Sequence, residues 1–303
     1  MTQRIQGVLA PVLTPFKSDY SPDAARLIAH CKWLIASGSG LALFGTNSEA
    51  NSLTVDERMS LLDQVIDAGV DPARIMPGTS CCAAGDTVRL SAHAVSRGCA
   101  GVLMLPPFYY KGVSDEGLFR SFANVIERVN DDRLRVYLYH IPPVAQVGIS
   151  AALIDRLLGA YPGIVAGMKD SSGDWANIHA MLEAFAPRGF DVFVGSEMYL
   201  LASMKHGAKG AISAAANIIP GLISTLHRTW QAADAEAQQA RLDAVRAVMI
   251  KQPMLPALKR VVAHWRHDDE WARVRPPLVE LTASQAATLV DGLQKIGFDM
   301  PGV

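Results

Sequence analysis

Short apolar segments with β-branched residues recur about every 30 residues through the first two thirds of this sequence. Eight such segments are present, at residues 7–16, 40–45, 74–79, 101–106, 135–141, 164–169, 190–195 and 207–213. Helix-start signals lie between them, for example the capping pair Thr54 and Glu57, or Ser114 ahead of two acidic residues. Strands that alternate with helices pair in parallel through right-handed crossovers. Eight such units favour a closed barrel over an open sheet.

The pattern changes near residue 221. Upstream, neither a GxGxxG nor a GxxxxGK[ST] phosphate-binding turn occurs, which argues against a doubly wound nucleotide-binding sheet. Downstream, strand-like segments stop and helical periodicity takes over, as at residues 222–233 and 235–249 and after the capping pair Thr282 and Gln285. We therefore predict an α/β fold, with a (β/α)8 TIM barrel over residues 1–220 and a C-terminal helical extension over residues 221–303.

The composition indicates which partners to expect. The 28 Lys and Arg residues balance 29 Asp and Glu without long runs of one sign, so we expect no nucleic-acid or membrane partner. Adjacent Cys81 and Cys82 lack a CxxC spacing, and the four cysteines of this chain form no disulfide framework. His264 and His267 have no third ligand nearby in the sequence, so no metal is predicted. These features predict a cytoplasmic protein with a small-molecule partner.

The active site of a barrel lies at the carboxyl ends of its strands, where an apolar segment turns polar. Four such places occur, at residues 45–49 (GTNSE), 107–110 (PFYY), 139–142 (YHIP) and 169–172 (KDSS). Period-2 alternation puts Val165, Gly167 and Lys169 on one strand face, with the glycine leaving space beside the lysine stem. If that face is the barrel interior, burial disfavours the ammonium and leaves an amine that can attack a ketone. A lysine that reaches solvent or pairs with Asp170 is the alternative.

Two other places carry polar groups that suit the same chemistry. Tyr139 is a strand residue whose phenol, at the barrel mouth, can donate and accept a proton. Thr46 and Asn47 follow Gly45 on a short turn, where backbone N–H groups can hold a carboxylate and the Thr46 hydroxyl can relay a proton. Taken singly, a strand tyrosine is more often a packing residue, and such turns are common in loops. The residues alone therefore leave these roles open.

Five motifs, in order along the chain, give these residues a context. They are GTNSE at 45–49, YHIP at 139–142, GMKDSSGD at 167–174, GSE at 195–197 and GAKGAISAAANIIP at 207–220. Together they resemble the dihydrodipicolinate synthase / N-acetylneuraminate lyase family of class I aldolases. The resemblance implies a (β/α)8 barrel with a C-terminal helical extension and a reaction that needs no metal or organic cofactor. It also implies a homo-oligomer, a dimer or a tetramer built from tight dimers.

The same resemblance implies roles for individual residues. Lys169 would form a Schiff base with a 2-oxo acid, and Tyr139 would shuttle protons at the reacting atoms. Thr46 would link Tyr139 to a second tyrosine, Tyr109, which in the family reaches into the neighbouring subunit's site.

A substrate-binding set is implied as well. The backbone amides of Thr46 and Asn47 would bind the carboxylate of the 2-oxo acid, and the carbonyl of Ile212 would line the pocket. The expected partners are therefore a small 2-oxo acid, such as pyruvate, and an aldehyde.

Departures from the family pattern bear on the substrate. Val144 stands where dihydrodipicolinate synthases typically carry an arginine for the acceptor's carboxylate, and valine cannot make that charge-assisted bond. Gln146 replaces a usual glycine, and the common GTTGE turn is GTNSE here. We therefore expect a lyase that acts on a 2-keto-3-deoxy sugar acid or a 4-hydroxy-2-oxo acid. A 4-hydroxy-tetrahydrodipicolinate synthase, a 2-keto-3-deoxy acid dehydratase, a non-catalytic 2-oxo-acid-binding barrel and a metal-dependent aldolase stay open as alternatives.

Overall fold

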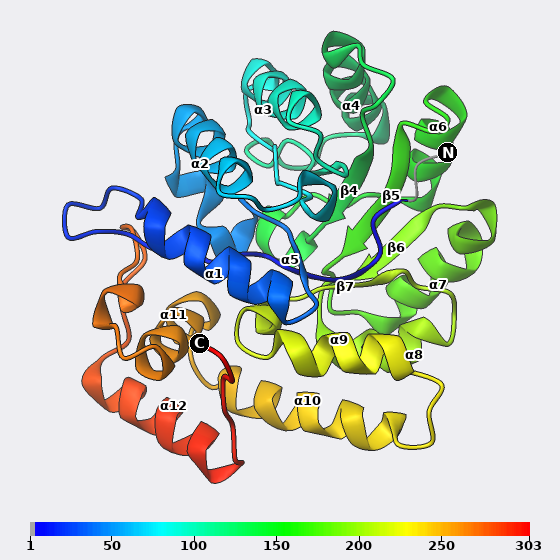
Figure 1. The fold of residues 1–303 in the computed structure, drawn as a ribbon. Coiled ribbons are helices and arrows are strands. Elements are labelled where there is room, and N and C mark those ends of the chain that lie inside the picture. The colour runs from blue at the N-terminus through cyan, green and yellow to red at the C-terminus, as the bar shows by residue number, and fades with distance from the viewer. Residues whose placement is uncertain (1–3) are drawn as a thin grey trace.

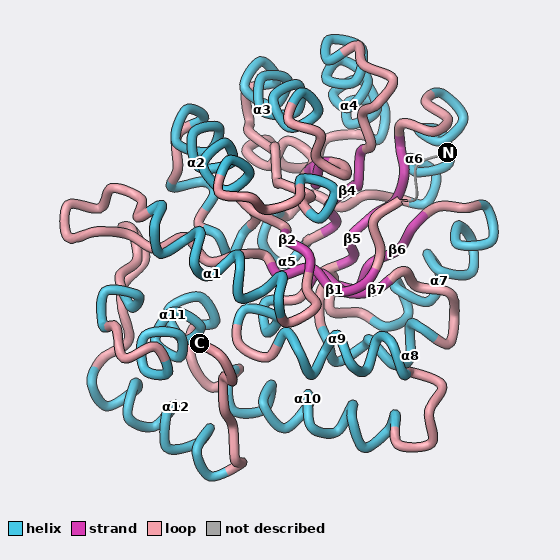
Figure 2. The backbone as a smooth tube through the Cα atoms, viewed as in Figure 1, coloured by secondary structure: helices cyan, strands magenta, loops and turns pink. Residues whose placement is uncertain are grey.

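A computed structural model describes residues 4–303 of the chain as a curled parallel sheet surrounded by helices (Figure 1). Seven strands follow the order β2-β1-β7-β6-β5-β4-β3, and each neighbouring pair is parallel. They are β1 (Gly7–Ala10), β2 (Gly40–Leu41), β3 (Val102–Met104), β4 (Val136–His140), β5 (Val165–Asp170), β6 (Asp191–Val194) and β7 (Gly210–Ile212). Figure 2 shows these strands gathered at the centre, with helices outside them. The predicted α/β class with parallel pairing is confirmed.

The helices follow the predicted alternation with strands. They are α1 (Ala24–Ala36), α2 (Val55–Asp67), α3 (Ala84–Ser96), α4 (Asp115–Val129), α5 (Pro142–Ala145), α6 (Ala151–Ala160), α7 (Trp175–Phe185), α8 (Leu200–Met204), α9 (Pro220–Thr229), α10 (Ala235–Met249), α11 (Met254–Trp265) and α12 (Ala283–Lys295). The capping pair Thr54 and Glu57 starts α2, with reciprocal bonds of 3.1 and 2.8 Å. Among residues 4–303, no helix is both long and apolar enough to cross a membrane.

The strands are shorter than the apolar segments that predict them. β1 ends at Ala10, because Pro11 has no N–H with which to continue the ladder. β2 has two residues, and Phe44, further along the same segment, has a φ of 60°. That left-handed conformation cannot belong to a strand. Local backbone geometry therefore ends both strands before their apolar segments end.

The third predicted strand, at residues 74–79, is not a regular strand. The segment makes isolated parallel bridges to Leu41 and Leu103. The N–H of Met76 donates to the Leu41 carbonyl at 2.8 Å, and the N–H of Leu103 donates to the Pro77 carbonyl at 2.9 Å. Pro77 itself has no N–H, so the ladder is interrupted there. Within residues 4–303 the structure thus has seven regular strands where we predicted eight.

A compact cluster of buried side chains fills the inside of the curled sheet. Each of the eight apolar segments contributes to it. Its members are Leu9, Ala42, Met76, Leu103, Tyr137, Tyr139, Ala166, Phe193 and Ile212. A larger apolar cluster lies between the sheet and the helices. The inner cluster supports the polar residues that follow the strands at their carboxyl ends.

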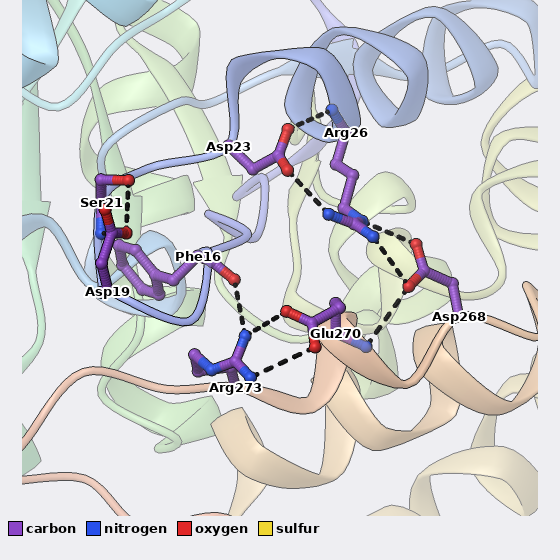
Figure 3. Close-up of polar contacts among 8 residues, drawn as sticks. All are labelled: Phe16, Asp19, Ser21, Asp23, Arg26, Asp268, Glu270 and Arg273. Carbon is purple, nitrogen blue, oxygen red and sulfur yellow. Dashed lines mark hydrogen bonds and ion pairs between the residues drawn. The ribbon is translucent and has the colours of Figure 1, made fainter.

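The C-terminal helices pack beside the sheet's helical layer. α9 contacts β1, whereas α10 contacts α9 and α12, and α11 contacts α12. Polar contacts tie this part of the chain to its N-terminal part (Figure 3). Arg26 of α1 lies 2.6 Å from Asp268 and 2.7 Å from Asp23, and Arg273 donates to the Phe16 carbonyl at 3.4 Å. The extension is therefore fixed against α1 and against the segment that precedes it.

Candidate active site

Lys169 lies near the carboxyl end of β5 and is buried, with 3% of its surface exposed. β4 and β5 pair so that Tyr139 is the register partner of Lys169. The Lys169 Nζ lies 3.3 Å from the Tyr139 hydroxyl and 4.3 Å from the centroid of its ring. The sheet register therefore brings an amine and a phenol together.

The neighbouring carboxylate, Asp170, is held by other groups. Its Oδ1 accepts a hydrogen bond from the Ser172 N–H at 2.8 Å, and its Oδ2 accepts one from the Asn177 Nδ2 at 2.6 Å. Within residues 4–303, no ion pair joins Asp170 to Lys169. Lys169 is thus neither a lysine that reaches solvent nor the partner of Asp170.

Glycine at position 167 was expected to leave space for the stem of Lys169, but the structure shows a different reason for it. The register between β4 and β5 shifts here, and Gly167 pairs with Tyr137. A Cβ on Gly167 would lie 2.2 Å from the Asp191 carbonyl oxygen and 2.9 Å from the Tyr137 ring. The glycine is therefore required by the close approach of β4 and β6, and not by the stem of Lys169.

Thr46 extends the pair into a chain of three polar groups. Its Oγ1 lies 3.2 Å from the Tyr139 hydroxyl, which in turn contacts Lys169. Residues Thr46–Ser48 form one turn of 3-10 helix. Within residues 4–303, the backbone N–H groups of Thr46 and Asn47 donate to no protein acceptor. Two free amides are thus available to an anionic ligand beside the lysine.

These groups share the wall of one cavity at the carboxyl ends of the strands. Its volume is 520 Å³. Helices α10 and α11 of the extension close part of this wall, so the cavity is not made by the sheet alone. Its lining includes Thr46, Asn47, Tyr139, Val144, Lys169 and Arg246. An amine, a phenol, a hydroxyl and free amides at one cavity can bind and activate a small oxo acid.

The chain as a whole matches a known protein family. The sequence model of the Dihydrodipicolinate synthetase family matches residues 4–296. This protein belongs to the dihydrodipicolinate synthetase family. The predicted family is confirmed.

Relatives and solved structures agree with this family. A relative from Chloroflexus aurantiacus, named as a DapA-like lyase, is 33% identical over 96% of this chain and 97% of its own. Dihydrodipicolinate synthase from Agrobacterium tumefaciens has a TM-score of 0.89 and 32% identity, and the match covers 96% of this chain and 99% of that one. A prophage protein of the family from E. coli K12, in complex with pyruvate, has a TM-score of 0.87 and 27% identity over 97% and 99% of the chains. The predicted enzyme class, a lyase, is confirmed.

Tyr109 is the predicted site residue that a single chain does not bring to the site. It lies between β3 and α4, is 73% exposed and packs edge-on against Tyr110 at 5.3 Å between ring centroids. Within residues 4–303, no hydrogen bond joins Tyr109 to Thr46, whose own side chain is exposed. Its role in a neighbouring subunit, implied by the dihydrodipicolinate synthetase family, stays a prediction.

Ile212 lies on β7 and has a fully buried side chain. That side chain packs in the inner cluster with Tyr139. Ala214, two residues further on, lines the cavity instead. Because the implied role of Ile212 involves its carbonyl, a contact between it and a ligand stays a prediction.

The family departures lie where they can affect the substrate. Val144 is in α5, directly after β4, lines the cavity and is 60% exposed. Gln146 has a φ of 54°, in the left-handed region that glycine occupies at little cost. The backbone conformation that suits the usual family glycine is thus kept with a glutamine. The change at Val144 therefore alters the side chain on the cavity wall, whereas Gln146 keeps the turn.

Two charged residues of the extension belong to the site's surroundings, and sequence analysis did not identify them. Arg246 of α10 lines the cavity. Lys259 of α11 is fully buried and forms an ion pair with Glu49, which has a left-handed φ of 54°. Burial lowers the pKa of Lys259 to about 8. Glu49 lies in the GTNSE motif, so its segment could be identified from the sequence. Nothing in the helical sequence around Lys259 indicates that this lysine pairs with Glu49.

Other reactive groups near the cavity have structural roles. Burial raises the pKa of the Cys81 thiol, which disfavours the thiolate that a nucleophile needs. The His140 Nδ1 accepts a hydrogen bond from the Ile149 N–H at 3.0 Å, and burial lowers the pKa of this histidine. Across residues 4–303, no group of three or more His, Cys, Asp and Glu side chains is arranged to hold a metal ion.

Proposed function

We propose that this protein is a class I lyase in which Lys169 forms a Schiff base with pyruvate or a related 2-oxo acid. The observation that carries the proposal is a series of two hydrogen bonds on the cavity wall. The Lys169 Nζ lies 3.3 Å from the Tyr139 hydroxyl, which lies 3.2 Å from the Thr46 Oγ1. The E. coli K12 member of the family is described in complex with pyruvate, which supports a 2-oxo acid as ligand. The free amides of Thr46 and Asn47 would hold its carboxylate.

In the proposed reaction, the neutral amine of Lys169 attacks C2 of the 2-oxo acid, and Tyr139 donates a proton to the ketone oxygen. The nitrogen of the resulting carbinolamine returns a proton to Tyr139, which passes it to the C2 hydroxyl. That oxygen leaves as water, and an iminium between Lys169 and C2 remains beside the Tyr139 phenolate. In cleavage, the Tyr139 phenolate takes the proton of the C4 hydroxyl and the C3–C4 bond breaks. The electron pair of that bond passes to the iminium, which gives an aldehyde and an enamine. Protonation at C3 and hydrolysis then return pyruvate and the free lysine.

The nature of the second substrate is a separate part of the proposal. Val144 leaves an apolar side chain where a guanidinium would hold the carboxylate of an acceptor in a dihydrodipicolinate synthase. We therefore propose cleavage or condensation of a 2-keto-3-deoxy sugar acid or a 4-hydroxy-2-oxo acid. A dehydratase would use the same iminium but lose the C4 hydroxyl as water. Two alternative functions for the same cavity are those of a 4-hydroxy-tetrahydrodipicolinate synthase and of a non-catalytic 2-oxo-acid-binding barrel.

The assembly proposed is a homo-oligomer, either a dimer or a dimer of dimers. The exposed Thr46 and the exposed Tyr109 support it, because Tyr109 of a second copy would extend the chain of hydroxyls. We further propose that the sheet closes as an eight-stranded barrel through residues 74–79, since this segment hydrogen-bonds to Leu41 and Leu103 on its two sides. The division into residues 1–220 and 221–303 and a cytoplasmic location stay predictions.

Reductive trapping tests the central step. The protein is incubated with pyruvate, reduced with sodium borohydride and analysed by intact mass and peptide mapping. We expect one pyruvate-dependent adduct on Lys169, its loss in Lys169→Arg, and an unchanged adduct in Lys295→Arg, which alters an exposed lysine of α12. An adduct on a different lysine, or none, would contradict the proposal. Turnover that a chelator abolishes and that Lys169→Ala retains would instead identify a metal-dependent aldolase.

A further inference from the structure

Arg246 lies on the wall of the Schiff-base cavity with unused hydrogen-bond donors. It belongs to α10, and 23% of its side chain is exposed. The nearest acid is Glu197, whose Oε1 lies 3.9 Å from the Arg246 Nη1, too far for a hydrogen bond. The Arg246 Nε is buried and has no partner. Within residues 4–303, no protein acceptor takes a hydrogen bond from this guanidinium.

Two acids lie near Arg246, and neither accepts a hydrogen bond from its guanidinium. Glu197 is fully buried, and its Oε2 accepts a hydrogen bond from the Ser213 hydroxyl, whereas its Oε1, which faces Arg246, has no hydrogen-bond partner among residues 4–303. Asp243, on the same helix, accepts one from the Gln239 Nε2 at 2.9 Å. Arg246 therefore has one countercharge, Glu197, at ion-pair distance, while its hydrogen-bond donors at the cavity wall stay unused.

A half-buried guanidinium in this state is costly unless something else accepts its hydrogen bonds. A carboxylate matches its planar fork and can bind it through two parallel hydrogen bonds. In the proposed function, a ligand tethered to Lys169 would present its C1 carboxylate to the free amides of Thr46 and Asn47. The far end of the same ligand is then the part that is free to meet Arg246, because Val144 offers no polar group there.

We propose that Arg246 binds a second carboxylate at the far end of the substrate, and that the enzyme prefers 2-oxo acids with an acid group at each end. 2-Keto-3-deoxy acids derived from aldaric acids have this chemistry, whereas those derived from aldonic acids end in a hydroxymethyl group. This inference rests on the proposed function and specifies its substrate class. Arg246 is a specificity-determining residue in this scheme and takes no part in the proton transfers.

Paired substrates test the inference. Steady-state kinetics are measured with two six-carbon 2-keto-3-deoxy acids that differ only at C6, one a carboxylate and one a hydroxymethyl group. Arg246→Gln should lower kcat/KM for the diacid by about 10- to 100-fold, mainly through KM, and change that for the monoacid by less than about threefold. Arg246→Lys, which keeps the charge but loses the fork, should fall between. Arg241→Gln, an exposed position on the same helix, is the matched control and should leave both unchanged.

The outcomes separate this inference from the function on which it rests. Equal losses for both substrates in Arg246→Gln would show a structural role and overturn the inference. So would a wild-type enzyme that traps pyruvate on Lys169 yet turns over the monoacid as well as the diacid. Failure of the wild-type enzyme to form any borohydride-stable adduct would overturn the Schiff-base function itself. A diacid preference that is confined to proteins with Arg246 would support the inference.

Discussion

The buried ion pair between Lys259 and Glu49 allows a quantitative test of how the C-terminal extension stabilises the GTNSE turn. Both side chains are 0% exposed. The Lys259 ammonium also donates to the Arg273 carbonyl at 2.7 Å and lies 4.4 Å from the centroid of the Phe16 ring. The second oxygen of Glu49 accepts a hydrogen bond from the Arg275 N–H at 2.8 Å. Each charge thus has one countercharge and one further hydrogen-bond partner.

Removal of either charge leaves the other buried without compensation. Lys259→Met should therefore lower the free energy of unfolding by about 3–5 kcal/mol, and Glu49→Gln should cost a similar amount. The double variant buries no charge at this place, so we expect it to lie within about 2 kcal/mol of the wild type. The sum of the two single costs should thus exceed the cost of the double variant by several kcal/mol, which is the signature of direct coupling.

Urea unfolding at pH 7 measures these differences, with the protein concentration held constant because assembly contributes to stability. Lys251→Met, which changes an exposed lysine between α10 and α11, is the control and should stay within about 0.5 kcal/mol of the wild type. A Lys259→Met variant as stable as this control would refute the reasoning. A double variant that loses the sum of the single costs would refute it equally.

Three further predictions follow from individual contacts. Burial, with the nearby Arg266 guanidinium, lowers the pKa of His30 from 6.5 to about 3. Between these two pH values, His30 takes up a proton in the unfolded chain but not in the folded chain. Stability should fall by about 1.4 kcal/mol per pH unit from this group as the pH drops below 6.5, and His30→Gln should show a shallower loss in urea unfolding down to about pH 4.5; equal slopes would contradict this. Gly167→Ala should cost about 1–3 kcal/mol in thermal unfolding, because its Cβ would lie 2.2 Å from the Asp191 carbonyl oxygen, and an unchanged melting temperature would argue against that clash. Tyr139→Phe should lower kcat by about 10²- to 10⁴-fold with the fold retained in circular dichroism, whereas wild-type turnover would exclude its role in proton transfer.

The sequence predicted the half of the site that follows from strand geometry. Lys169 and Tyr139 each lie near the carboxyl end of an apolar segment, and parallel pairing makes the ends of neighbouring strands adjacent. Their contact therefore follows from local pattern and topology. The GTNSE turn was identified for the same reason, since it follows another strand and lies at the same edge of the sheet.

The features that the sequence did not predict depend on contacts between distant segments. Nothing local shows that Lys259 pairs with Glu49, because the two residues lie on an outer helix and on a turn after β2. The reason for Gly167 also depends on a neighbouring strand, through the Asp191 carbonyl. The irregular segment at 74–79 has an apolar composition typical of a strand, and the interruption comes from a single missing N–H at Pro77.

The sheet and the C-terminal extension contribute different residues to the cavity, which bears on how substrate preference is set. Lys169 and Tyr139 are register partners, so neither backbone position can move without a shift of the sheet, and the proposed chemistry at C2 depends on that ladder. Arg246 lies on α10, which packs against α9 and α12 outside the sheet, so a substitution there can change the far end of the cavity while leaving the strands in place. Under the proposal for Arg246, the extension sets the substrate preference, whereas the sheet positions Lys169 and Tyr139. We expect differences in substrate preference to depend on residues 144 and 246, which both line the cavity.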